Sequence, residues 1–221
     1  MLARISLGRA GHSLPTKELL AFQLAHAKAR DAVFKELDCT SYAQYCPLNV
    51  HSAAPNRAIF LRRPDLGRRL SNPLTLQRGD YDAVIILADG LSATAVHRHA
   101  GPVLDALLPL LEGWKLAPIV VAQQARVAIS DEIGELLGAK MSLILIGERP
   151  GLSSPDSLGA YLTWGPRVGR NDSERNCISN IREEGLKPSL AARRIAMLME
   201  AARGQRVTGV GLSGGAISAK E

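Results

Sequence analysis

Aromatic residues are scarce in this 221-residue sequence, at 4% of the chain, although hydrophobic residues as a whole make up 46%. The core must therefore consist mainly of Ala, Leu, Ile and Val, which are typical of helices and parallel strands. No apolar run reaches the ~20 residues of a membrane-spanning helix, and the first residues lack the apolar block of a secretory signal. We therefore expect a cytoplasmic protein without a membrane partner.

Cysteine is also rare. Cys39, Cys46 and Cys177 form no C-x-x-C pair, and their odd number favours reduced thiols over a disulfide framework or a structural zinc site. His97 and His99 are two positions apart in a helix-like segment, where their side chains would not face each other, and no third ligand lies nearby in the sequence. We expect no metal site.

Several common binding and catalytic motifs are missing. The turn after the first buried run reads ADGLSA rather than G-x-G-x-x-G, and no G-x-x-x-x-G-K-[ST] loop occurs, which disfavours dinucleotides and P-loop nucleotides. The string GLSGG at residues 211–215 has no strand-to-helix context, so it predicts a flexible tail rather than a hydrolase nucleophile. The net charge of +6 comes from scattered arginines without a reader helix, so we expect no nucleic-acid partner.

Residues 16–37 predict one long helix, because Thr16 can serve as the N-cap and no Gly or Pro follows it. Apolar residues at helical spacing predict a buried stripe, made of Leu20, Leu24, Ala27 and Phe34. A polar ridge beside it contains Gln23, His26 and Arg30. This ridge fits either a solvated face or a surface that docks onto a partner or ligand.

The pattern breaks into Pro-, Asn- and Arg-rich pieces between Asp38 and Gly79. We place a boundary near Gly79. It separates an N-terminal helical region, residues 1–78, from a larger domain, residues 79–221.

In the larger domain, buried apolar runs alternate with helix-like segments. The runs are residues 82–90, 117–123 and 141–147, and a last helix is expected at residues 188–204. Strands that are apolar throughout and alternate with helices are typical of a parallel sheet covered on both faces. The predicted fold class is therefore α/β, with a doubly wound, Rossmann-like, mostly parallel sheet preceded by the smaller helical region.

Ligands of such sheets bind beyond the carboxyl ends of the strands. Three loops of this sequence leave that edge, at residues 88–92, 123–130 and 147–154. The last loop is a long polar corner directly after a buried run. We expect the three loops together to hold a large ligand.

Six blocks of the sequence resemble, in order, the small (light) subunit of adenosylcobalamin-dependent ethanolamine ammonia-lyase. They read FQLAHAKARDAV, RPDLGRRL, VIILADGLSATAV, RVAISDEIGELLGA, LIGERPGLSSPDSLGAYLTW and SERNCISNIREEGL. The resemblance extends from about Ala3 to about Gly211. It implies a carbon–nitrogen lyase that converts ethanolamine to acetaldehyde and ammonia by radical chemistry, often in association with a bacterial microcompartment.

The resemblance also implies a partner and a cofactor. In this family a large subunit, a TIM barrel, carries the catalytic residues, and the small subunit covers the other side of the cobalamin in a hetero-oligomer. Three positions match cobalamin-contacting residues of the family, Val127, Glu148 and Cys177. Val127 and Glu148 also lie on the binding edge expected from the strand order, whereas Cys177 could instead be a small buried thiol.

Two other functions stay open at this point. One is a stand-alone α/β enzyme that acts on a phosphorylated small molecule at the same edge, and the other is a basic scaffold for nucleic acid. The sequence has no D-x-H-x-x-G string. If cobalamin is the ligand, we therefore expect its own dimethylbenzimidazole, and no side chain of this protein, to hold the cobalt from below.

Overall fold

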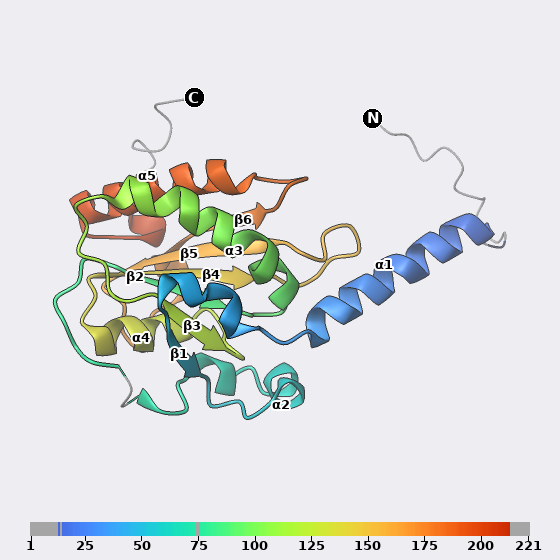
Figure 1. Ribbon diagram of the computed structural model, residues 1–221, viewed down its shortest axis with the longest axis horizontal. Coiled ribbons are helices and arrows are strands. Elements are labelled where there is room, and N and C mark those ends of the chain that lie inside the picture. Colours follow the sequence, from blue (N-terminus) through green and yellow to red (C-terminus); the bar gives the residue numbers. More distant parts are fainter. Residues whose placement is uncertain (1–12, 14, 74–75, 213–221) are drawn as a thin grey trace.

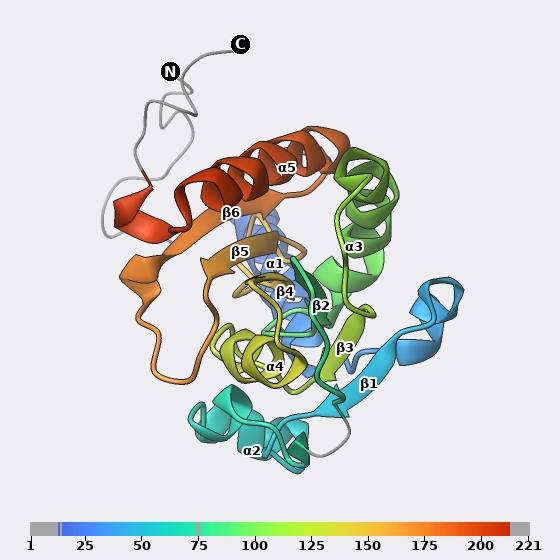
Figure 2. The same ribbon diagram turned by 90° about the vertical axis from the view of Figure 1, so that its left-hand side faces the viewer.

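The computed structural model describes residues 13, 15–73 and 76–212 (Figures 1 and 2). The helices are α1 (Thr16–Phe34), α2 (Arg57–Arg62), α3 (Ala93–Leu107), α4 (Ile129–Leu137) and α5 (Pro188–Gln205). The strands are β1 (Leu48–His51), β2 (Val84–Ala88), β3 (Val120–Gln123), β4 (Met141–Gly147), β5 (Leu158–Trp164) and β6 (Arg175–Ile181). A 3-10 helix, Cys39–Tyr45, precedes β1.

The six strands form one sheet in the order β1-β3-β2-β4-β5-β6. Strands β1, β3, β2 and β4 are parallel, whereas β5 is antiparallel to both of its neighbours. The predicted α/β class with a mostly parallel sheet is confirmed.

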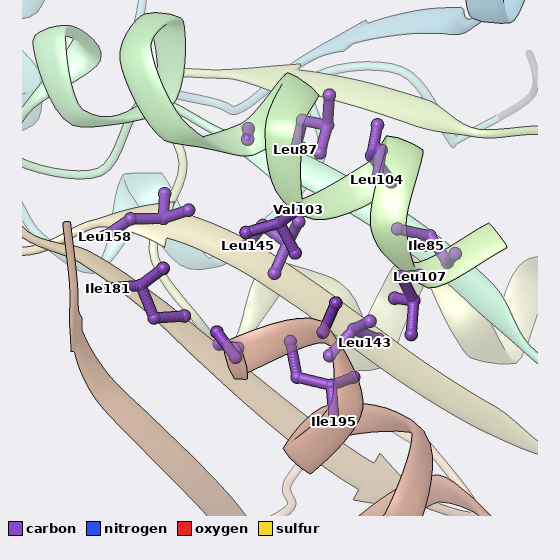
Figure 3. Packing of buried hydrophobic residues seen from close by; sticks show 14 of the residues in the cluster. Ile85, Leu87, Val103, Leu104, Leu107, Leu143, Leu145, Leu158, Ile181 and Ile195 are labelled. Atoms are coloured by element: carbon purple, nitrogen blue, oxygen red, sulfur yellow. The ribbon is translucent and has the colours of Figure 1, made fainter. Parts of the chain in front are cut away.

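Helices lie on both faces of the sheet, with α3 and α5 on one face and α4 on the other (Figure 2). Alternate residues of β2 serve the two faces, because successive side chains of a strand point in opposite directions. Ile85 and Leu87 pack toward α3 and α5, as Figure 3 shows, whereas Val84 and Ile86 pack toward α4. Every residue of β2 and β4 is therefore buried, which explains their uninterrupted apolar runs.

The carboxyl-terminal half of the sheet differs from the predicted doubly wound pattern. No strand was predicted beyond residue 147, but β5 and β6 continue the sheet as antiparallel strands. Parallel neighbours need a crossover of a dozen or more residues, usually a helix. Residues 148–157 contain no helix, so the chain turns back beside β4 and runs in the opposite direction.

The N-terminal region is not purely helical. Strand β1 lies within residues 1–78 and pairs in parallel with β3, so this region supplies an edge strand of the sheet. The sequence did not predict this strand because it has only four residues, of which only Val50 is buried, and Pro47 and Pro55 lie close on either side. A domain boundary near Gly79 remains a prediction.

Helix α1 begins and ends close to the predicted limits, but its predicted buried stripe is wrong. Of its residues only Ala32 is buried, whereas Leu20, Leu24 and Phe34 are 58%, 57% and 57% exposed. The residue before the helix is Pro15, and Thr16 makes no side-chain cap. Figure 1 shows the reason, because α1 extends away from the sheet and little of this chain packs against it.

In the part of the chain that the structure describes, no helix is both long and apolar enough to cross a membrane. The predicted flexible tail, residues 211–215, is wrong at its start, because Gly211 ends a 3-10 helix and Leu212 is buried in the core on the α5 side of the sheet. Residues 213–215 lie outside the described residues.

A buried ion pair fastens α4 to β6. The guanidinium of Arg175 donates from both terminal nitrogens to the two carboxylate oxygens of Asp131, each at 2.7 Å, and both side chains are 2% exposed. Arg175 Nη1 also donates to Thr163 Oγ1 at 2.9 Å. Asp131 is thus a structural residue in the first turn of α4, with no free oxygen for acid–base chemistry.

Asp131→Ala should lower the free energy of unfolding by about 3–5 kcal/mol, because it leaves the Arg175 charge buried without its partner. Asp65→Ala is the control, since Asp65 pairs with Arg63 on the open surface and its loss should change little. Urea unfolding followed by circular dichroism measures both. Equal transition midpoints in the two variants would show that the buried pair is not stabilising.

Candidate functional site

The carboxyl ends of β2, β3 and β4 meet at one edge of the sheet, where the predicted loops lie. The chain runs from β2 to β3 on one side and then to β4 on the other side of β2, so the strand order reverses between β2 and β4. Ligands of open α/β sheets bind at such a reversal. The loops after β2 and β4 touch at this point, because Leu91 N donates to Gly147 O at 2.9 Å.

Two glycines allow this close approach. Gly90 adopts a left-handed conformation with φ of 52°, and a Cβ on it would lie 2.2 Å from Gly147 O. A Cβ on Gly147 would lie 2.1 Å from Ser92 O. Side chains at either position would therefore push the β2 and β4 loops apart.

A buried pair, Asp89 and Arg57, holds the ends of β2 and β3 together. The fully buried Asp89 carboxylate accepts from the backbone N–H groups of Gln124 at 2.9 Å and Ala125 at 3.0 Å, and from Arg57 Nη1 at 3.2 Å. Arg57 Nη1 also donates to Gly90 O at 2.8 Å. Burial raises the pKa of Asp89, and the two backbone donors and Arg57 oppose that rise.

Arg57 also connects the pair to α1. Its Nε donates to Val33 O, in the last turn of α1, at 2.7 Å. The side chain starts at the first residue of α2, which Asn56 caps by accepting from Ile59 N. The sequence analysis did not identify Asp89 or Arg57 as a pair, because they are 32 residues apart in the chain.

Three hollows lie along this edge. The first, about 300 Å³, is lined by Arg126, Val127, Tyr161 and Cys177 among others. The second, about 420 Å³, shares Arg126, Val127 and Tyr161 with the first and adds residues of both glycine loops, including Gly90 and Glu148. The third, about 540 Å³, shares Glu148 and Arg149 with the second and adds Asn180 and Arg182. Because neighbouring hollows share residues, we treat them as one surface and call it the edge groove.

All three residues matched to the family's cobalamin contacts lie on the edge groove. Val127 lines the first two hollows, Glu148 the second and third, and Cys177 the first. The side chain of Cys177 is exposed, with Sγ 3.2 Å from Ser179 Oγ. The alternative that Cys177 is a small buried thiol is therefore wrong.

Glu148 is held by its own chain. Its Oε2 accepts from the Ser157 hydroxyl and from Asn180 N, the latter at 3.2 Å. Its backbone N–H donates to Ser157 O at 2.9 Å. These contacts fix the carboxylate where β4, β5 and β6 meet, and within the described residues they engage Oε2 rather than Oε1.

Tyr161 is a groove residue that the sequence analysis missed. It pairs in register with Cys177 across β5 and β6, so both side chains lie on the α4 side of the sheet. Burial raises the pKa of Tyr161, and the neighbouring Cys177 and Glu148 raise it further. The phenol therefore stays protonated at neutral pH and can donate a hydrogen bond. The one signal in the sequence was a tyrosine inside an otherwise apolar strand.

The remaining candidate residues lie elsewhere. His97 Nε2 accepts from Asp38 N at 3.0 Å, whereas His99 is buried with its Nε2 3.5 Å from the Asp156 carboxylate. In the described chain no group of three His, Cys, Asp or Glu side chains could hold a metal ion. The polar ridge of Gln23, His26 and Arg30 is exposed on α1.

The fold and the groove define an α/β protein with a broad, partly polar groove at the carboxyl ends of its parallel strands. A family model described as ethanolamine ammonia-lyase light chain matches residues 1–213. The chain therefore belongs to this family.

Individual relatives agree with the family match. The ethanolamine ammonia-lyase small subunit of Pseudomonas aeruginosa (strain LESB58) is 53% identical over 95% of this chain and 83% of its own length. The small subunit of Azotobacter vinelandii is 54% identical over 95% and 84%. That of Ralstonia nicotianae is 51% identical over 94% and 83%.

Asp89→Asn should destabilise the protein by roughly 3 kcal/mol, because Arg57 loses its buried counter-charge and one of the backbone N–H groups loses its acceptor. The exposed Asp80, which lies 3.4 Å from Lys115 Nζ, provides the control Asp80→Asn, which should change little. Urea denaturation of both variants tests this. A transition midpoint for Asp89→Asn as high as that of Asp80→Asn would contradict the role assigned to the pair.

Proposed function

We propose that this chain is the small subunit of an ethanolamine ammonia-lyase and that its edge groove forms part of the binding site for adenosylcobalamin. The supporting observation is that Val127, Glu148 and Cys177, which are far apart in the sequence, line neighbouring parts of one groove.

The residues of the groove suit the chemistry of a cobalamin. The corrin is a broad ring whose rim carries amide groups, so it needs hydrogen-bonding partners spread over a wide and partly apolar wall. Val127 supplies apolar surface, the neutral Tyr161 hydroxyl is a donor, and the Glu148 carboxylate is an acceptor for amide N–H groups. Cys177 adds a small, polarisable side chain beside Tyr161.

The role proposed for this chain is binding and orientation. Radical chemistry is supplied by the cofactor when it is bound. Glu148 can orient the corrin rim because Ser157 and Asn180 already fix its carboxylate. We assign no catalytic residue and no axial cobalt ligand to this chain.

We further propose that a large subunit covers the open side of the edge groove. The names of the relatives as small subunits support such a partner. Helix α1 supports it too, because Leu20, Phe22 and Leu24 are each more than half exposed. Large apolar side chains exposed together on one helix are typical of a surface that packs against another chain. The ridge of Gln23, His26 and Arg30 lies on the same helix.

The test is to purify this chain alone and together with a large chain of the family. We expect the complex, mixed with adenosylcobalamin, to show the visible absorption bands of bound corrin after gel filtration and to release ammonia from ethanolamine. The small chain alone should be inactive. Ammonia release by the large chain without this one would contradict the proposal. Turnover of a phosphorylated small molecule by this chain alone, without cobalamin, would support the stand-alone enzyme instead.

Glu148→Ala should weaken adenosylcobalamin binding by the complex about tenfold or more, since a hydrogen bond to a charged group is lost. Folding should be little affected, because Ser157 and Asn180, the two partners of the carboxylate, both line the third hollow, where water can replace it. Glu112→Ala removes an exposed carboxylate away from the groove and is the matched control. Equilibrium titration of corrin absorbance measures both affinities, and equal values would remove Glu148 from the site.

A further inference from the structure

Arg126 lies in the wall of the edge groove, where its guanidinium forms no hydrogen bond or ion pair with any residue that the structure describes. Arg126 lines the first and second hollows, directly before Val127. Its Nε is buried and forms no hydrogen bond with any described residue. A buried N–H donor without an acceptor is costly, and a cationic one more so. The protein keeps this donor at the place where a ligand is expected.

The position of Arg126 is fixed by packing. Its backbone N–H donates to Gly67 O at 2.7 Å, and its Cζ lies 4.5 Å from the centroid of the Phe60 ring. Gly67 makes room for both side chains, because a Cβ there would lie 2.9 Å from Arg126 Cγ and 2.7 Å from a carbon of the Phe60 ring. The arginine is therefore held against an aromatic ring rather than free in solvent.

Positive charge accumulates around Arg126. Burial lowers the pKa of its guanidinium, and the cations of Arg57, Arg149 and Arg68 lower it further, while Asp89 opposes them. The guanidinium nevertheless stays charged at neutral pH, as arginine does in proteins. Asp89 already pairs with Arg57. Arg68 lines the first hollow and Arg149 the second, both with exposed side chains.

Carboxylates near the groove neutralise only part of this cluster. Asp172 lines the first hollow, but its carboxylate lies 3.4 Å from Arg175 Nε. Glu148 lines the second hollow and keeps its negative charge, because its donors, Ser157 and the backbone of Asn180, are neutral, but two arginines line the same hollow. Among the residues that the structure describes, no ion pair is formed by Arg126, Arg68 or Arg149. The groove thus has an excess of positive charge on its Arg126 side.

We propose that Arg126, with Arg68 and Arg149, forms a subsite of the edge groove for a phosphate ester. Arginine is suited to this group because its planar N–H fork matches phosphate oxygens. This proposal rests on the proposed function and adds to it a contact for the phosphate of the cofactor. The nucleotide tail of cobalamin contains one phosphodiester, and that group is the ligand assigned to the subsite. A separate phosphorylated metabolite is the other source of the same chemistry.

The experiment compares two corrin ligands of the complex between this chain and its large partner. Cyanocobalamin has the nucleotide tail with its phosphodiester, whereas dicyanocobinamide has the corrin but no nucleotide tail. Arg126→Gln should lower the affinity of the complex for cyanocobalamin about tenfold or more and leave the affinity for dicyanocobinamide unchanged. Arg126→Lys keeps the charge but loses the planar pair of N–H donors, so its affinity for cyanocobalamin should lie between those of wild type and Arg126→Gln.

Arg193→Gln on α5 is the matched control, because it removes the same charge from an exposed position outside the groove and should change neither affinity. Circular dichroism and co-purification with the large chain check that each variant folds and assembles. An equal loss for both ligands in Arg126→Gln, or no loss for either, would overturn the phosphate subsite while leaving cobalamin binding intact.

A third arm separates this inference from the proposed function. If the wild-type complex binds neither corrin, the cobalamin proposal fails, and binding of inorganic phosphate then decides the subsite. Phosphate binding that is present in wild type and lost in Arg126→Gln would support a subsite for a separate phosphorylated ligand. No phosphate binding by the wild-type complex in that case would overturn the subsite as well.

Discussion

The binding edge depends on one buried ion pair, Asp89 with Arg57. Removing two charges from water is costly, and here the cost is offset because each charge finds further hydrogen bonds, to the backbone of Gly90, Gln124 and Ala125. The carboxylate accepts from two successive N–H groups and so restrains the path of the loop after β3. That loop continues directly to Arg126 and Val127, so the pair holds one wall of the groove without lining it.

The mixed sheet supplies the rest of the groove. Since β5 runs back beside β4, the strands β5 and β6 present Tyr161 and Cys177 on the α4 side, while their other face packs toward α5. Helix α4 covers the parallel strands, and the first hollow lies between its N-terminal loop and these two side chains. A fully parallel sheet would require a further crossover helix, which would occupy one of its faces.

The sequence predicted the parallel half of the fold because β2, β3 and β4 are buried on both faces and alternate with helices. It failed for β6, whose partial exposure blurs the apolar pattern, and for β5, which is mostly buried but contains Gly159 and Thr163. It also failed for α1, whose apolar residues suggested a core contact that this chain does not make. Val127 and Glu148 could be assigned to the binding edge from strand order. Asp89 and Arg126 also lie in loops that the sequence places at this edge, at residues 88–92 and 123–130. Their contacts with Arg57 and Phe60, and the place of Tyr161 in the groove, could not be predicted, because they join segments that are distant in the chain.

The central claim is that a corrin binds against the loops at the carboxyl edge of this sheet. Hydrogen–deuterium exchange of the complex with its large chain, recorded with and without cyanocobalamin, tests it most directly. We predict slower exchange of backbone amides in residues 124–130, 147–154 and 176–181, and no change at the opposite edge in residues 138–141. Protection by cyanocobalamin that is absent from all three of these segments, or confined to the opposite edge, would contradict the account.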